Sequence, residues 1–381
     1  MMVAEVVTTM RDVSARWFAV LSFPVVAAVA ACGVLLDISG DPSSPATDGG
    51  DGGGSTGADG AGVSDAGALP DADVDACAMP AACAPELLGT LPGSVVRLVA
   101  SSGALYAAAS GAQPSIFRID LAPPHTTLDL DPSGVVPEEF RGDSNIAVDP
   151  SGAVFWGTAN GLRRRDADAG ASAANDAGLT TMSELGAPVA GVRIAGGRLH
   201  YTVAGPNGGA GVNTGHLASC ALPLCNDVQQ ISFVPDPTDV IAIGASRWWL
   251  ATDATLTMHM LHSISGPIGP EETVPSRMVT DGARIIWSTS DALRMFTIAT
   301  GALVDLLPAG STSRVNGVVL DTDGTLYVTQ GAAVERCTIA ADKCTFSEMA
   351  KTGSQAIDVA VDATFLYWGN LDGSVLRLRK P

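Results

Sequence analysis

The chain has 381 residues, of which 43 are glycine and only 16% are charged, and its formal net charge is −19. An acidic surface repels phosphate backbones, so we expect no nucleic-acid partner. After Trp17 no long stretch places apolar residues at helical spacing. Short apolar runs broken by Gly, Pro, Asp and Asn recur instead, which predicts an all-β protein.

Residues 1–31 have the layout of a bacterial export signal. Arg11 and Arg16 precede an apolar run over residues 17–31, and small residues end that run. Met10 is an alternative start, because the residues that follow it form a compact basic leader. A plain membrane helix is the alternative to a cleaved signal, since residues 17–36 are long enough to span a bilayer.

The end of this run, Val29-Ala30-Ala31-Cys32, resembles a lipobox, the motif of lipoprotein signal peptidase. The resemblance implies that Cys32 becomes the mature N-terminus and carries lipid. The same resemblance implies that Gly33 after the cysteine, where an Asp would mark retention at the inner membrane, favours the outer membrane. We therefore expect a cell-envelope lipoprotein of the outer membrane, facing the periplasm or the cell exterior.

Residues 32–85 are predicted to be a disordered tether. Residues 37–75 carry nine Asp and no Lys or Arg, among Gly, Ser, Ala and Pro. Such a composition has almost nothing to bury and cannot offset the entropy of ordering.

A repeated phrase fills the rest of the chain: an apolar strand, a turn with Asp or Gly, an apolar–aromatic strand and a third strand. Its seven instances are spaced 37 to 49 residues apart, near the length of a four-stranded propeller blade. Their central residues are Tyr106, Phe155, His200, Trp249, Ile286, Tyr327 and Tyr367. A four-stranded sheet has two apolar faces, and radial stacking of sheets covers both. We predict a β-propeller over residues 86–381 with seven blades, six or eight being the alternatives because the fourth phrase is weak.

The phrases resemble bacterial propeller repeats of the YVTN and YWTD kinds. The likeness is carried by Leu-Tyr-Val-Thr at residues 326–329, Leu-Tyr-Trp-Gly at 366–369 and the stretch 147–156. The aspartate that would follow Tyr-Trp-Thr is absent here. No calcium or ligand role tied to that acid is therefore carried over.

The last phrase leaves room for only three strands before the chain ends. Residues 85–93 precede the first phrase and are predicted to supply the missing fourth strand. The N-terminal strand would then complete the last blade and close the ring.

Seven cysteines are present, and assigning Cys32 to lipid leaves six in three close pairs. An exported chain is oxidised, so we predict three local disulfides. Cys220–Cys225 and Cys337–Cys344 are expected where the two outer strands of a blade turn, and Cys77–Cys83 just before the closing strand. A zinc site is the runner-up, but no Cys-x-x-Cys pair supports it.

No catalytic motif, cofactor motif or metal motif stands out, so we predict no catalytic residue, cofactor or metal ligand. The basic run 163–165 is expected in a solvated loop, and Asp129 with Asp131 on a solvated outer edge. The Gly-rich stretch 205–215 is expected to be a loop on one propeller face, where binding surfaces often form.

Two functions remain. The first is a monomeric, membrane-anchored binding module whose propeller face takes a protein or glycan. The second is a lactonase-like propeller hydrolase with a metal in the central channel, which needs acids converging there. Four aspartates occupy a repeated turn position beside the inner strand and are the candidate acids of the channel mouth: Asp149, Asp281, Asp321 and Asp362.

Overall fold

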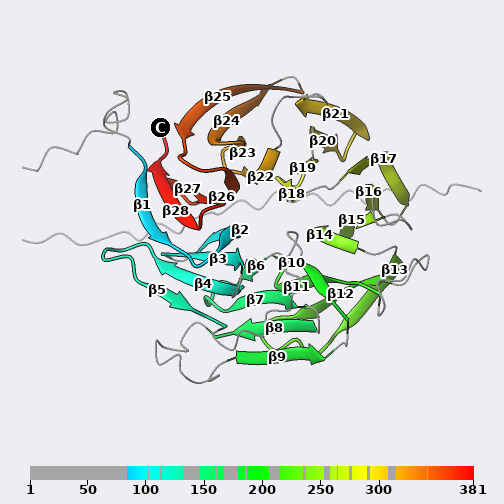
Figure 1. Ribbon diagram of the computed structural model, residues 1–381. Coiled ribbons are helices and arrows are strands. Elements are labelled where there is room, and N and C mark those ends of the chain that lie inside the picture. The colour runs from blue at the N-terminus through cyan, green and yellow to red at the C-terminus, as the bar shows by residue number, and fades with distance from the viewer. Residues whose placement is uncertain are drawn as a thin grey trace, which may run out of the picture. The chain divides into compact units, whose positions relative to one another are not determined.

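A computed structural model describes residues 84–101, 103–111, 114–131, 146–158, 161–166, 179–184, 187–205, 215–234, 237–252, 258–263, 265–273, 277–289, 292–307, 315–340 and 342–381. Every regular element in these ranges is a β-strand, and the strands form seven antiparallel sheets of four. The sheets stand around a common centre as the blades of a propeller (Figure 1). The prediction of an all-β propeller with seven blades is confirmed.

In six blades the four strands follow one another in sequence, from the centre of the ring outward (Figure 1). Blade 1 contains β2 (Ser94–Ser101), β3 (Ala104–Ser110), β4 (Ser115–Asp120) and β5 (Thr127–Asp129). Blade 2 contains β6 (Ile146–Val148), β7 (Val154–Thr158), β8 (Gly161–Arg165) and β9 (Leu179–Glu184). Blade 3 contains β10 (Val189–Ala195), β11 (Arg198–Val203), β12 (Gly215–Ala221) and β13 (Gln229–Val234).

The second half of the ring repeats this order. Blade 4 contains β14 (Pro237–Ile243), β15 (Ser246–Thr252), β16 (Met258–Ser263) and β17 (Gly266–Thr273). Blade 5 contains β18 (Met278–Thr280), β19 (Arg284–Ser288), β20 (Leu293–Thr297) and β21 (Ala302–Leu307). Blade 6 contains β22 (Val315–Leu320), β23 (Thr325–Gln330), β24 (Ala333–Ala340) and β25 (Lys343–Lys351).

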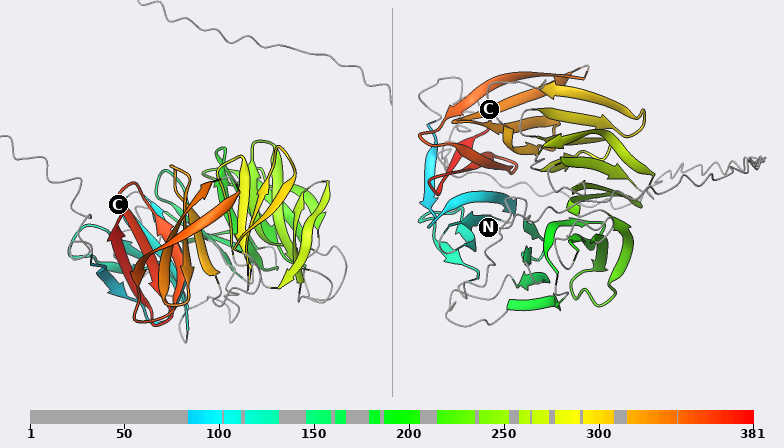
Figure 2. Two further views of the ribbon diagram at one scale, coloured as in Figure 1. Left: turned by 90° about the horizontal axis from the view of Figure 1, so that it is seen from above. Right: turned by 45° about the vertical axis from the view of Figure 1, so that its right-hand side comes forward.

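Blade 7 joins the two ends of the propeller. It contains β26 (Ala356–Val361), β27 (Phe365–Asn370), β28 (Ser374–Arg379) and, as its outer strand, β1 (Glu86–Thr90). β1 pairs antiparallel with β28, and Arg377 of β28 forms an ion pair with Glu86 at 2.8 Å. The predicted closure by an N-terminal strand is confirmed, and both views in Figure 2 show β1 beside the red C-terminal strands.

Apolar side chains pack between successive blades, because each sheet has two faces to bury. Tyr106 of blade 1 lies in one cluster with Trp156 of blade 2, whereas Phe155 lies in the next cluster with Tyr201 of blade 3. Neighbouring residues of one strand thus face opposite blades, as strand geometry requires. Equivalent clusters lie between the other blade pairs, and the central residues of all seven phrases are buried.

Two of the predicted disulfides are present. Cys220 joins Cys225 between β12 and β13, and Cys337 joins Cys344 between β24 and β25, with Cα–Cα distances of 4.7 and 5.5 Å. Both lie at the turn between the two outer strands of a blade, as expected. The pair Cys77 and Cys83 lies outside the described residues, as do Cys32, the export signal and most of the tether.

Replacing Cys337 and Cys344 together by alanine is expected to lower the free energy of unfolding by about 2 kcal/mol, because the short loop is no longer closed in the unfolded chain. Urea unfolding of the variant and of the oxidised and reduced parent chain measures this. A variant as stable as the oxidised parent would contradict the pairing.

His200 makes the stability of blade 3 dependent on pH. It takes the place that aromatic residues hold in five of the other blades and is 1% exposed. Burial, helped by the nearby Arg247 guanidinium, lowers its pKa from 6.5 to about 4. Between pH 6.5 and 4, His200 is therefore protonated in the unfolded chain and neutral in the folded chain. The contribution of His200 to the free energy of unfolding is fully present above pH 6.5 and is lost as the pH falls toward 4.

We expect this residue to account for a loss of roughly 3 kcal/mol between pH 7 and pH 4. Urea unfolding at several pH values should show a shallower acid slope for His200→Phe than for the parent chain. Identical slopes would assign the acid sensitivity to other groups.

The described part of the chain contains no helix long and apolar enough to cross a membrane.

Candidate functional site

The four predicted channel-mouth acids occupy equivalent turns in four different blades. Each follows the innermost strand of its blade: Asp149 after β6, Asp281 after β18, Asp321 after β22 and Asp362 after β26. Among the described residues, no hydrogen bond or ion pair connects one of these carboxylates to another. The structure thus places them in one repeated position without bringing them into contact.

Each of these carboxylates holds its own turn together. Asp149 accepts hydrogen bonds from the backbone N–H groups of Ser151 and Ala153, both at 2.9 Å. Asp362 does the same with Thr364 and Phe365, both at 2.7 Å. An aspartate that caps the backbone two or more residues later is a common turn-forming device.

The other two acids also form ion pairs with basic side chains. The Asp321 carboxylate lies 2.6 Å from the Lys380 ammonium. Asp281 lies 2.6 Å from the Arg284 guanidinium. Burial opposes ionisation of Asp281, but hydrogen bonds from Arg284 and Ala283 outweigh it and lower its pKa. All four acids therefore have a visible structural role.

The basic run 163–165 and its acidic neighbours differ from prediction. Arg163 and Arg165 belong to strand β8, and Arg165 is buried and donates to the Leu130 carbonyl. Arg163 pairs at 2.8 Å with Asp131, which is also buried. The expected solvated loop and solvated edge are both wrong, because the opposite charges meet between blades 1 and 2. The binding loop expected at 205–215 lies largely outside the described residues.

Charged residues on the innermost strands form a second group, which the sequence reading did not identify. Asp358 lies in β26, Asp239 in β14 and Arg97 in β2, while Arg277 immediately precedes β18. These four residues hold the same position in their blades. Three of the strands, β2, β14 and β26, have a bulge just before it. A bulge re-aims the side chain that follows it.

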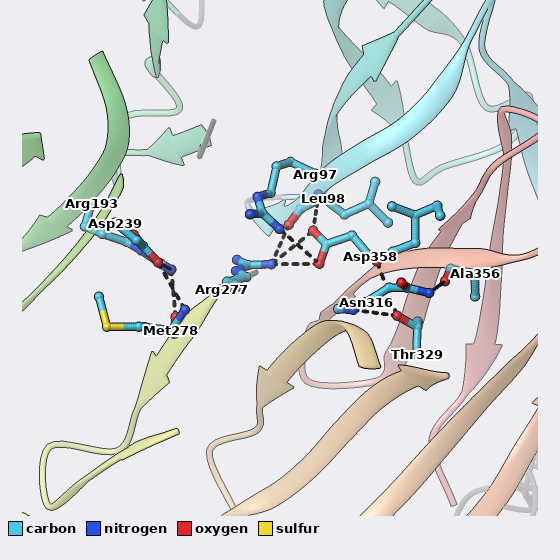
Figure 3. A network of polar contacts seen from close by, with 12 residues as sticks. Arg97, Leu98, Arg193, Asp239, Arg277, Met278, Asn316, Thr329, Ala356 and Asp358 are labelled. Carbon is cyan, nitrogen blue, oxygen red and sulfur yellow. Dashed lines mark hydrogen bonds and ion pairs between the residues drawn. The ribbon is translucent and has the colours of Figure 1, made fainter. Parts of the chain in front are cut away.

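Asp358 is the centre of this group of charged residues, which we call the channel network (Figure 3). One of its oxygens accepts the Leu98 N–H at 2.8 Å, and Arg277 Nη1 lies 3.1 and 3.4 Å from the two oxygens. Arg97 approaches to 3.9 Å. The Asp358 carboxylate is completely buried, so these contacts replace the hydration that it loses. The network ties the inner strands of blades 5, 7 and 1.

Arg277 reaches past blade 6 to make these contacts, and a glycine in blade 6 lets its inner strand approach Asp358. Gly317 of β22 holds the corresponding position in blade 6, and a Cβ there would lie 2.6 Å from the Asp358 Cα and 2.8 Å from Asp358 Oδ1. Only a residue without a side chain fits. Beside it, the Asn316 amide donates to the Ala356 carbonyl at 2.8 Å and joins the same two strands.

A second pair lies on the other side of the network in Figure 3. Arg193 of β10 donates to Asp239 at 3.1 Å and to the Met278 carbonyl at 2.7 Å. Asp239 in turn accepts the Met278 N–H at 3.0 Å. Blades 3, 4 and 5 are thereby linked at the channel.

A cavity of about 280 Å³ opens beside these pairs. Its walls come from the inner strands of blades 3, 4, 5 and 6: Arg193, Ile194, Ala195, Ile241, Ala242, Arg277, Met278, Val279, Thr280, Val319 and Leu320. Most of these residues are apolar, and Thr280 and the two arginines are the polar ones. Burial lowers the pKa of Arg277 to about 10, against the effect of Asp358, so the side chain is still charged at neutral pH.

Within the described ranges, no three His, Cys, Asp or Glu side chains converge so that they could hold a metal ion. The charged side chains of the innermost strands form Arg–Asp pairs instead, and such side chains can bind a charged ligand. The residue four positions before the turn acid is the sequence signal for this network. It is Arg277 before Asp281 and Asp358 before Asp362.

The comparisons with known proteins agree on the fold. No protein-family model matches the chain, and no curated protein matches it significantly. The WD40 β-propeller domain of Doa1 superposes with a TM-score of 0.57 and 11% identity, over 78% of this chain and 97% of that one. A catalytically inactive variant of virginiamycin B lyase from Staphylococcus aureus, crystallised with quinupristin, gives 0.55 and 12%, over 78% and 99%. The designed protein Ika8 gives 0.51 and 11%, over 77% and 100%. At these identities the likeness shows a β-propeller and nothing finer.

Proposed function

We propose that this protein is an outer-membrane lipoprotein, anchored through lipid on Cys32, whose propeller is a binding module for a protein or glycan. The supporting observation is the cavity of about 280 Å³ at the centre of the ring. Four blades build its wall, and Arg–Asp contacts fix that wall in place. Apolar cavities with a few oriented polar groups are typical of binding sites. The tether of residues 32–85 would carry the propeller away from the membrane.

The binding role predicts that filling the cavity abolishes partner capture. Ala242→Trp places an indole at the wall, and Thr338→Trp on the exposed face of β24 is the matched control. Both full-length variants and the parent chain are immobilised and exposed to solubilised cell-envelope material. We expect a partner retained by the parent and by Thr338→Trp and lost with Ala242→Trp. Equal capture by all three would place binding elsewhere on the ring.

The lipid anchor is tested separately by intact-mass analysis and membrane fractionation of the parent chain and Cys32→Ser. The proposal requires loss of residues 1–31, addition of lipid to Cys32 and release of the Cys32→Ser chain from the membrane. Recovery of an unmodified Cys32 in a chain that begins at Met1 or Met10 would overturn it.

The hydrolase alternative rests on the four turn acids. It requires a stoichiometric metal that disappears when Asp281 and Asp321 are replaced by asparagine. Elemental analysis of the purified parent chain and of this double variant separates the two functions.

A further inference from the structure

The cavity wall is positively charged in a strongly acidic protein. Of the described residues that line it, Arg193 and Arg277 are the charged ones. Their partners Asp239 and Asp358 hold them from behind and are not part of the wall. A cationic wall in a chain of net charge −19 favours a negatively charged occupant.

Both guanidiniums keep donors free for a ligand. Arg277 makes all its contacts through Nη1, and Arg193 makes its contacts through Nη2. Arg193 Nη1 and Arg277 Nη2 take part in none of these contacts, so they are the donors left for a ligand, whereas the Nε atoms of both are buried out of its reach. A guanidinium has five N–H donors in a planar fork that fits a carboxylate.

Apart from Thr280, the other residues of the wall are apolar. Ile194, Ala195, Val319 and Leu320 are partly exposed and would contact the body of a ligand rather than its charge. The volume of about 280 Å³ is near the lower end of small-molecule sites. An inorganic anion would not cover the exposed part of these side chains, whereas a short aliphatic chain would.

We propose that the cavity binds a small organic carboxylate, with the carboxylate on Arg193 and Arg277 and an aliphatic body against the apolar wall. This inference rests on the proposed binding function, because it names the class of ligand for the same cavity. The ligand is either free or the acidic end of a larger partner.

Hexanoate is the test probe, and hexanol, acetate and phosphate are its controls. Binding to the full chain is measured by isothermal titration and by ligand-observed saturation-transfer NMR. Hexanoate should bind more tightly than acetate, which lacks most of the apolar body, and more tightly than hexanol and phosphate. Equal binding of hexanol, or no detectable hexanoate binding by either method, would overturn the proposal.

Arg193→Met is the decisive variant. It keeps an unbranched apolar stem and removes the charged guanidinium, while Asp239 retains the Met278 and Val240 N–H donors. We expect hexanoate affinity to fall about tenfold or more, and Arg193→Lys to give an intermediate value. Arg294→Met removes a partly exposed arginine that pairs with Asp305 outside the cavity and should change affinity less than twofold.

Circular dichroism melting of every variant shows whether it is folded. If Arg193→Met does not fold, Ala195→Trp, which fills the cavity without touching the ion pairs, replaces it and should abolish hexanoate binding. Unchanged affinity in the folded variant would overturn the site. The hexanoate titration and the capture of an envelope partner give separate results. If the chain retains a partner but does not bind hexanoate, the proposed binding function stands and only the ligand class is wrong.

Discussion

Replacing Asp358 with alanine is expected to lower the free energy of unfolding by about 3–5 kcal/mol, because it leaves Arg277 buried without its counter-ion. Arg277 is 7% exposed and Arg97 is 3% exposed, so water cannot easily take the place of the carboxylate. The Leu98 N–H loses its acceptor as well. Urea unfolding followed by tryptophan fluorescence measures the change.

A surface pair provides the matched control. Asp305→Ala removes a half-exposed carboxylate that lies 3.5 Å from Arg294 and should cost at most about 1 kcal/mol. The triple variant Arg97→Met, Arg277→Met, Asp358→Leu removes all charges of the group together and should recover most of the stability. If Asp358→Ala were no more costly than Asp305→Ala, the channel network would have no role in holding the ring.

A chain that begins at residue 92 is expected to lose its cooperative unfolding transition, because the last blade would have only three strands. β1 contributes the buried Leu88, and the following Leu91 is buried and donates to the Gly373 carbonyl at 2.9 Å. Loss of a buried leucine side chain costs about 2–5 kcal/mol, so two approach the whole stability of an ordinary domain. Calorimetry and far-ultraviolet circular dichroism measure the transition.

The control for this truncation is the chain that begins at Ala68, where the C-terminal unit starts. It keeps β1 and should unfold within a few degrees of the full-length chain. A synthetic peptide of residues 84–91, added to the longer truncation, should restore part of the transition by rebuilding the edge of β28. A cooperative, unshifted transition in the chain that begins at residue 92 would show that the ring holds without its closing strand.

The fold was predictable because each blade repeats a pattern of residues that are close together in the sequence. Each blade repeats an apolar strand, a turn and an aromatic strand, and residues such as Phe155 and Trp156 are buried for local reasons of alternation. Closure was also predictable, since blade 7 was one strand short and residues 85–93 were unassigned.

The channel network was not predictable in the same way. Arg277 and Asp358 are 81 residues apart, Asp358 follows a bulge in β26, and it lies where only a glycine, Gly317, fits on the neighbouring strand β22. A single arginine before an apolar strand looks like any surface residue. Arg163 and Asp131, 32 residues apart, were misjudged for the same reason, because charge runs are solvated unless a distant partner is present.

The closing strand also sets an order of assembly during synthesis. Glu86 pairs with Arg377, 291 residues later, so the first strand of the ring to leave the ribosome waits for the last. Until then β1 has no partner and the edges of blades 1 and 7 are open. Contacts between such distant segments are slow to form, and exposed edges favour association with other chains. The nascent protein therefore passes through a vulnerable stage that ends only after β28 has been made, and chaperones that shield β-strand edges should matter most during that stage.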